Sequence, residues 1–164
     1  MSITTQIAET LAREFALPDA RMPTLIVVRL LVAAVLGGLV GLERERRGRA
    51  AGLKTHTLVA AGSALFVMAP LLAGVDAANT TRVMQGIVQG IGFLGAGAIL
   101  KAGPGERVKG LTTAAGIWMT SAIGMAAGMG MHIAALITTL VALLVFGALP
   151  RLVPSGTRGP RGHA

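Results

Sequence analysis

Long apolar stretches with almost no charge alternate along this chain with short loops rich in arginine and lysine. Each apolar stretch is long enough, or nearly so, to cross about 30 Å of hydrocarbon as a helix. This alternation predicts an all-α membrane protein, a bundle of about five transmembrane helices. The predicted spans are Leu25–Leu42, Thr57–Val75, Val83–Leu100, Leu111–Gly128 and Met131–Leu149. A re-entrant hairpin is the alternative for the last two spans, because almost nothing separates them.

Composition supports a membrane protein over a water-soluble one. Of the 164 residues, 53% are hydrophobic and 13% are charged, whereas a soluble domain carries roughly 25% charged residues. The absence of cysteine excludes disulfides and thiolate metal sites. The net charge of +8 sits in short loops between apolar stretches, so we expect no nucleic-acid partner.

The basic residues predict the orientation of the bundle. Most lysines and arginines follow the first, third and fifth spans, and the other two loops carry few. Positively charged loops stay in the cytoplasm. We therefore expect the N-terminus outside, the C-terminus in the cytoplasm, and a multi-pass protein of the bacterial inner membrane.

Residues 23–149 form the predicted transmembrane domain, with a distinct segment on each side. In residues 1–22, apolar residues at four-residue spacing predict an amphipathic helix on the outer membrane interface, with a loosely ordered terminus as the alternative. Residues 150–164 are rich in proline, glycine and arginine, which predicts a basic, disordered tail.

The loop after the first span holds charged residues that orientation alone does not require. Glu43 and Glu45 alternate with arginines, and Glu43 can pair with Arg46 or Arg47 at helical spacing. A solvated cluster of ion pairs is one interpretation. The other is a grouping of Glu, Thr and His that holds a cation or relays a proton, because His56 opens the next span. Two carboxylates make a weak protein site for magnesium, so we predict no metal site.

The third span carries a polar stripe. Arg82, Gln85 and Gln89 are three and four residues apart and share one face of a helix. Such a stripe is costly in a bilayer unless it pairs with another helix or lines a wet cavity, and we hold both interpretations open. The glycines of this span form a literal G-x-G-x-x-G, but within an apolar run they favour helix packing over nucleotide binding.

The fourth span presents a ridge of small residues and one tryptophan. Thr112 and Thr113 are expected to cap its start. Trp118 lies near mid-span, where its indole N–H needs a partner such as a threonine or glutamine of a neighbouring span. The three histidines are spread over distant segments, and no catalytic pattern occurs. We therefore expect neither an enzyme nor a bound cofactor.

Four blocks, in order, resemble the MgtC/SapB family of bacterial inner-membrane proteins over about residues 37–128. The blocks are GLVGLERE (Gly38–Glu45), AGLKTHTLVAAGSALF (Ala51–Phe66), GIGFLGAGAILK (Gly90–Lys101) and GLTTAAGIW (Gly110–Trp118). Matched to the family's motifs, the residues in this chain are Glu43, Arg44, Glu45, Thr55, His56, Gly92, Phe93, Gly95, Gly97, Thr112, Thr113 and Trp118.

The resemblance implies a regulatory membrane protein connected with magnesium limitation, acid tolerance and, in pathogens, virulence. It implies membrane-protein partners, with the F-type ATP synthase as one candidate, and self-association is a further expectation. A small cation or proton transporter is the alternative. The chain departs from longer members, which end in a cytoplasmic domain resembling the ACT fold. It also has Gln89 where a small serine or threonine is expected, and Lys54 where arginine is common.

Overall fold

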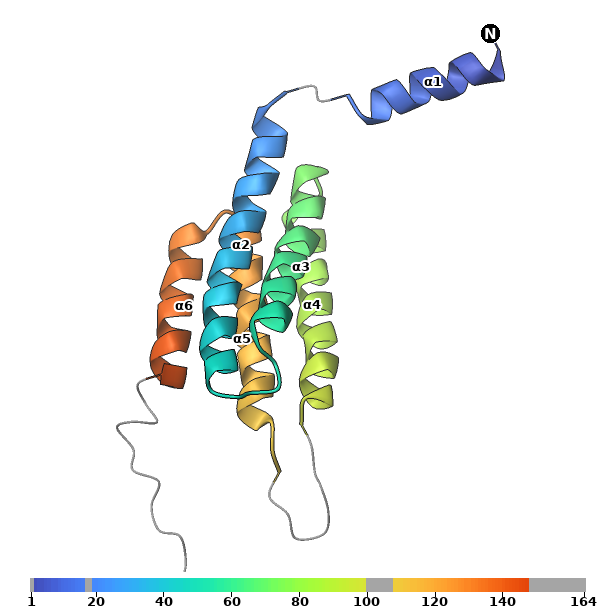
Figure 1. Cartoon of the computed structure of the whole chain (residues 1–164). Coiled ribbons are helices and arrows are strands. Elements are labelled where there is room, and N and C mark those ends of the chain that lie inside the picture. The colour runs from blue at the N-terminus through green and yellow to red at the C-terminus, as the bar shows by residue number, and fades with distance from the viewer. Residues whose placement is uncertain (1, 17–18, 100–107, 148–164) are drawn as a thin grey trace, which may run out of the picture.

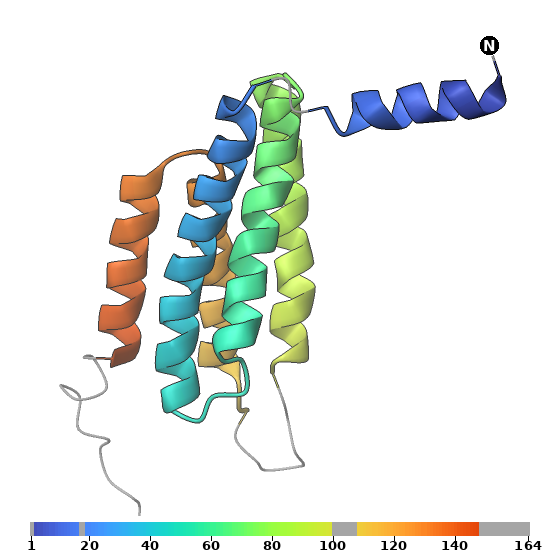
Figure 2. The ribbon, with the colours of Figure 1, turned by 45° about the horizontal axis from the view of Figure 1, so that its top comes forward.

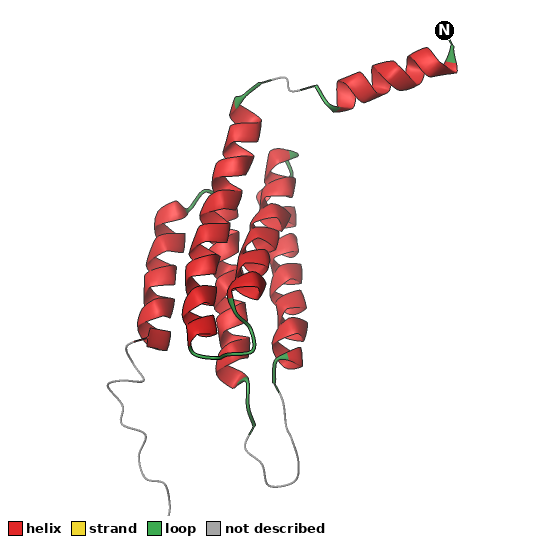
Figure 3. Ribbon diagram, in the orientation of Figure 1, coloured by secondary structure: helices red, strands yellow, loops and turns green. Residues whose placement is uncertain are grey.

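The computed structural model describes residues 2–16, 19–99 and 108–147, and within them the protein is all-α, as predicted (Figures 1 and 3). The helices are α1 (Ile3–Glu14), α2 (Arg21–Arg46), α3 (Leu53–Leu72), α4 (Ala77–Gly97), α5 (Leu111–Gly128) and α6 (His132–Gly147). Helices α2 and α3 are long and apolar enough to cross a membrane, and α6 is a shorter apolar helix.

Helices α2 to α6 correspond one to one to the five predicted spans. The bounds of α5 are those predicted. Helix α2 is longer than its predicted span at both ends. It begins at Arg21, and the charged residues after Leu42 continue the helix as far as Arg46. The predicted basic tail at residues 150–164 and most of the loop between α4 and α5 lie outside the described residues.

The five helices run alternately up and down, so that the described basic loops gather at one end of the bundle (Figure 1). We call this the basic end; it comprises the α2–α3 loop (residues 47–52) and the start of α5. The opposite end carries the short loops between α3 and α4 and between α5 and α6. Helix α2 packs on α3, α5 and α6, whereas α4 packs on α5 and α3 alone among the helices that the structure describes.

Small residues build the core, so the helices approach closely. Alanines from four helices contribute, among them Ala33, Ala60, Ala127 and Ala135, each fully buried. Glycines bring α5 against α3, because a Cβ at Gly124 would overlap the backbone of Ala60. Without a hydrophobic driving force between helices in lipid, such close backbone contact supplies van der Waals stabilisation.

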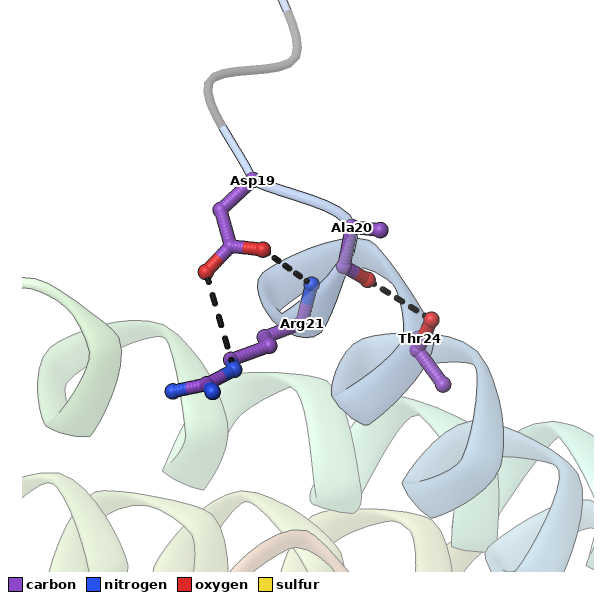
Figure 4. Close-up of polar contacts among 4 residues, drawn as sticks. All are labelled: Asp19, Ala20, Arg21 and Thr24. Atoms are coloured by element: carbon purple, nitrogen blue, oxygen red, sulfur yellow. Dashed lines mark hydrogen bonds and ion pairs between the residues drawn. The ribbon is translucent and has the colours of Figure 1, made fainter.

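Helix α1 has no buried residue and extends away from the bundle (Figure 2). The helix confirms the predicted secondary structure of this segment, and its position on a membrane interface stays a prediction. At the start of α2, the carboxylate of Asp19 accepts a hydrogen bond from the N–H of Arg21 at 3.0 Å (Figure 4). Thr24 donates its hydroxyl to the carbonyl of Ala20 at 2.7 Å. The bond to Asp19 satisfies one of the backbone N–H groups that a helix N-terminus leaves free.

Candidate functional site

The candidate residues at the basic end lie where α2 turns into α3. Glu43 forms the ion pair with Arg47 that the helical spacing predicted, and not one with Arg46. Arg47 in turn donates from Nη2 to the carbonyl of Gly147 at 2.7 Å. Glu43 therefore holds an arginine that ties the end of α2 to the end of α6, which is a structural use of this carboxylate.

Glu45 has a different role in the same hairpin. Its Oε2 accepts a hydrogen bond from the N–H of Leu53, the first residue of α3, at 2.7 Å. A Cβ at Gly52 would stand 2.6 Å from that oxygen, so glycine is needed at this position for the carboxylate to reach the helix. A negative charge at a helix N-terminus is favourable for the exposed N–H groups and the helix dipole.

Arg44 is the unexpected member of this group, because it is buried with only 2% of its surface exposed. Its guanidinium lies over the ring of Phe146 in α6, with Cζ 4.4 Å from the ring centroid. Among the described residues, its Nε and Nη2 have no hydrogen-bond partner. The stacking replaces part of the lost hydration with a cation–π interaction.

His56 is fully buried directly beside this pair of residues. Its Nδ1 lies 3.0 Å from the carbonyl oxygen of Gly52, which favours the tautomer that donates from Nδ1. Within the described part of the chain, Nε2 has no partner. A Cβ at Gly116 would lie 3.4 Å from that nitrogen and 3.5 Å from Phe146, so Gly116 lies directly against both rings.

Glu43, Arg44, Glu45 and His56 all lie at the basic end, but their contacts differ. Both carboxylates are engaged, one with an arginine and one with a helix N-terminus. Among residues 2–16, 19–99 and 108–147, no group of three or more acidic, histidine or cysteine side chains could hold a metal ion. The sequence pattern missed Phe146 and Gly116, because they lie far along the chain and carry no charge.

The polar stripe of α4 lies on the outer surface of the bundle. Arg82, Gln85 and Gln89 are all exposed, and the residues of α4 that the bundle buries, such as Ile91 and Gly95, lie on the other side of the helix. Hydrogen bonds from this stripe to a neighbouring helix are not found among the described residues. The stripe thus does not hold the bundle together in the way that one of our two interpretations required.

The candidate residues of α5 do not make the contacts that we expected. Gly110 takes the N-cap position with φ of 95°, and no side chain caps the helix, so the capping prediction for Thr112 and Thr113 is wrong. Thr113 is buried and Thr112 is exposed. Trp118 is 50% exposed, and among the described residues no hydrogen bond joins its indole N–H to a threonine or glutamine of a neighbouring helix.

An apolar groove of about 830 Å³ runs between α3 and α4 on the surface of the bundle. Thr55 and Lys54 lie at its basic end, and Ser63 and Phe66 lie further along α3. Gly62, Gly86 and Gly90 also line it, and a Cβ at each of these would meet nothing within 4 Å. Helix α3 contacts α4 less extensively than it contacts α5, and this looser contact leaves the groove between α3 and α4.

Several known proteins are similar in sequence. A protein named SrpB from Synechococcus elongatus is 47% identical over 135 residues, which cover 76% of this chain and 74% of that protein. A protein of Escherichia coli (strain K12) named "Putative magnesium transporter YhiD" is 39% identical, covering 77% of this chain and 61% of that protein. Protein MgtC of Brucella abortus is 47% identical, covering 74% of this chain and 50% of that protein.

The chain thus spans between half and three quarters of the length of these relatives. No solved structure matches it. The family model described as the MgtC family matches residues 30–154, which include the hairpin of Glu43, Arg44, Glu45 and His56 as well as the polar stripe of α4. This chain is therefore a membrane protein that belongs to the MgtC family.

Proposed function

We propose that this chain is a regulatory protein of the bacterial inner membrane that acts by binding other membrane proteins. All five helices from α2 to α6 cross the bilayer in this proposal, with the basic end in the cytoplasm and α1 on the outer interface. The positions of the basic loops at one end of the bundle support this orientation. At 1.5 Å per residue, the 21 residues of α4 extend about 31 Å, close to the hydrocarbon thickness.

The groove between α3 and α4 is the observation that carries the proposal. It is almost entirely apolar, opens on the surface of the bundle and has glycines along its floor at Gly62, Gly86 and Gly90. Small residues let another helix approach closely in lipid, where packing and not hydrophobicity drives association. A transmembrane helix of a partner protein fits this groove, and Lys54 at its basic end can meet an acidic group of that partner in the cytoplasm.

Transport is the competing function, and the packing of the interior argues against it. The buried polar side chains around His56 and Thr120 continue as far as Ser63 and Ser121, which share a hydrogen bond of 2.8 Å. Toward the opposite end, α3 and α5 meet in backbone contact at Gly128 and Ala64. A hydrated ion needs polar partners along its route. Ala64 and Gly128 contribute no polar side chain, and the Gly128 carbonyl already accepts a hydrogen bond from the guanidinium of Arg29 at 2.8 Å.

Family membership supports a proposal for the physiological setting. The name of the relative YhiD mentions magnesium transport, and we place that activity second to regulation in this chain. We propose a role under magnesium limitation or acid stress, exerted through membrane energetics, with the F-type ATP synthase as the first partner to examine. The proposal includes no catalytic step.

The test compares partner capture with ion flux. Gly90→Leu fills the groove, whereas Gly97→Leu is a matched control, since a Cβ at Gly97 also meets nothing and Gly97 does not line the groove. We expect purification from native membranes, followed by mass spectrometry, to recover a membrane-protein partner with the unaltered chain and the control but not with Gly90→Leu. Growth at low magnesium should fail with the same variant.

Flux measurements distinguish the two functions directly. We expect purified protein in liposomes to move magnesium and protons no faster than empty liposomes do. Robust cation or proton flux from the purified protein alone would overturn the regulatory proposal in favour of transport.

A further inference from the structure

One exposed face of α4 carries only polar or small side chains along the length of the helix. Six residues follow one another at intervals of four, three, four, three and four positions, and all six are exposed. We call them the α4 seam: Ala78, Arg82, Gln85, Gln89, Gly92 and Ala96. The buried residues of α4, Thr80, Ile91 and Gly95, lie on the opposite side of the helix.

The seam lies at the edge of the bundle. Among the described helices, α4 packs on α5 and α3 only, and it forms the side of the bundle away from α6 (Figures 1 and 2). Intervals that alternate between four and three residues are those of a heptad repeat, with which one helix keeps contact along another in a left-handed coiled coil. The spacing is therefore compatible with a second helix packed along α4, on a face that the described part of this chain leaves uncovered.

Contact between this face and lipid tails is energetically unfavourable. Gln85 lies about 12 Å and Gln89 about 18 Å from the first residue of α4 along the helix axis at 1.5 Å per residue. If α4 crosses the bilayer, as the proposed function requires, both amides lie near the middle of the hydrocarbon. An amide that faces lipid tails loses its hydrogen bonds with water and gains none in return. A polar partner at the same depth removes that cost.

We propose that the α4 seam binds the α4 seam of a second copy of this chain, so that the protein is a dimer about a two-fold axis along the bilayer normal. Two copies inserted with one topology place each seam residue at the same depth as its counterpart. Glutamine suits this arrangement because its amide both donates and accepts, so Gln85 and Gln89 can each pair with the same residue of the second copy. A buried amide at one such position also selects a single register.

The remaining seam residues are compatible with this dimer. Gly92 and Ala96 have small or no side chains, and a Cβ at Gly92 meets nothing within 4 Å in this chain, so two α4 helices can approach closely toward the basic end. Arg82 is five residues after the start of α4. Its long side chain reaches the aqueous interface, which keeps the two guanidinium groups apart and solvated.

The dimer leaves the proposed partner groove accessible. Leu94 lines that groove and lies on a different side of α4 from the seam. A partner helix in the groove and a second copy on the seam therefore occupy separate surfaces of the same helix. The two proposals share the requirement that α4 spans the membrane, and neither needs the other's partner.

Disulfide cross-linking in native membranes tests the dimer, because the chain has no cysteine of its own. Gly92→Cys places a thiol in the seam. Leu94→Cys is the matched control, since it is exposed, two residues away and outside the seam. We expect oxidation to convert Gly92→Cys to a covalent homodimer at least about ten times more efficiently than Leu94→Cys.

A second measurement uses variants whose fold is not in question. Gln85→Leu and Gln89→Leu each replace an exposed amide with an apolar side chain, and energy transfer between labelled copies in vesicles reports association. Interhelical hydrogen bonds in membranes are worth roughly three- to thirty-fold in affinity. We expect each of Gln85→Leu and Gln89→Leu to weaken self-association by a factor in that range, while Val141→Leu on α6 leaves it unchanged.

Three outcomes would overturn the dimer. Equal cross-linking of Gly92→Cys and Leu94→Cys would remove the seam as the interface. A cross-linked product of Gly92→Cys with the mass of a different protein would assign the seam to another partner. Labelling of Gly92→Cys in intact membranes by a water-soluble maleimide would place α4 outside the bilayer, and that result would also overturn the topology of the proposed function, whereas the first two leave it standing.

Discussion

Two glycine-rich faces of this bundle differ in what lies against them. Where α5 meets α3, a Cβ at Gly124 or Gly128 would overlap the backbone of Ala60 or Ala64. On α4, a Cβ at Gly86 or Gly90 would meet nothing within 4 Å. We call the first the closed face and the second, with the groove and the seam, the open face. Glycine permits close helix approach in both, but only the closed face has its partner helix within the chain.

The difference assigns the two faces to different tasks. The closed face determines the stability of one copy, because its helices are already in backbone contact. On the open face, a Cβ at Gly86 or Gly90 would meet nothing within 4 Å, and Gln85 and Gln89 are exposed, so we propose that these residues serve binding. Substitutions on the closed face should therefore change unfolding, and matched substitutions on the open face should change association.

We expect the largest loss of stability from truncating the aromatic ring that α6 contributes to the buried core of the bundle. Phe146→Ala removes a buried ring, 7% exposed, and the support of the buried Arg44 guanidinium. Cavities of this kind cost about 3–5 kcal/mol. We expect the free energy of unfolding in detergent, measured by denaturant titration, to fall by about 3 kcal/mol or more.

Phe66→Ala is the control for that prediction, because Phe66 is 62% exposed and lines the groove. Its removal should change the unfolding free energy by less than about 0.5 kcal/mol. Equal losses for the two variants would contradict the division into closed and open faces.

The glycines provide the second comparison. Gly124→Ala forces a methyl group against the Ala60 carbonyl, and relief requires α3 and α5 to move apart. Overpacking of this kind costs about 1–3 kcal/mol. Gly90→Ala adds the same methyl group in open space and should cost nothing measurable. Thermal unfolding, monitored by circular dichroism in the same detergent, should give a lower melting temperature for Gly124→Ala than for Gly90→Ala. Equal melting temperatures would show that the closed face is loosely packed.

The sequence was sufficient to predict the helices but not to distinguish the two faces. Uninterrupted apolar runs between charged loops gave the five helices of the bundle, and the i, i+4 spacing predicted the ion pair of Glu43 with Arg47. Both depend on residues that are close along the chain. Glycine spacing looks alike on α4 and α5. It indicates that another helix can approach closely, but it does not indicate whether such a helix is present.

Arg44 is a second case in which local pattern was insufficient. An arginine among arginines in a loop is expected to be solvated, yet Arg44 is buried because Phe146, about a hundred residues away, lies under its guanidinium. The expected threonine caps of α5 failed for a local reason instead. Gly110 adopts a positive φ at the N-cap position, so the helix starts without a side-chain acceptor.

A smaller effect is expected at the hairpin that joins α2 and α3. Glu45→Ala removes the acceptor for the N–H of Leu53 at the start of α3. Loss of a cap at a helix N-terminus costs about 1 kcal/mol. Glu45→Gln keeps an oxygen at the same position and should retain part of that stabilisation, while losing the charge that favours a helix N-terminus. Amide hydrogen exchange at Leu53 should rise in the order unaltered chain, Glu45→Gln, Glu45→Ala; equal exchange in all three would mean that this carboxylate does not cap α3.

The smallest effect concerns the start of α4, which belongs to the open face. Asp76 accepts hydrogen bonds from the backbone N–H of Asn79 at 2.9 Å and from its side-chain amide at 2.7 Å. These bonds favour the charged carboxylate and hold the pKa of Asp76 below its ordinary value. Because the folded-state pKa is the lower one, the stabilisation is complete above the ordinary aspartate pKa and is lost as the pH falls through the folded-state value. Protection of the Asn79 amide from hydrogen exchange should therefore decrease only in strong acid, and Asp76→Asn should abolish that pH dependence while leaving the Gly124–Ala60 contact protected. Loss of protection at both faces together would show that α4 is part of the same cooperative unit as the closed face, and that the open face is less independent than its exposed glycines suggest.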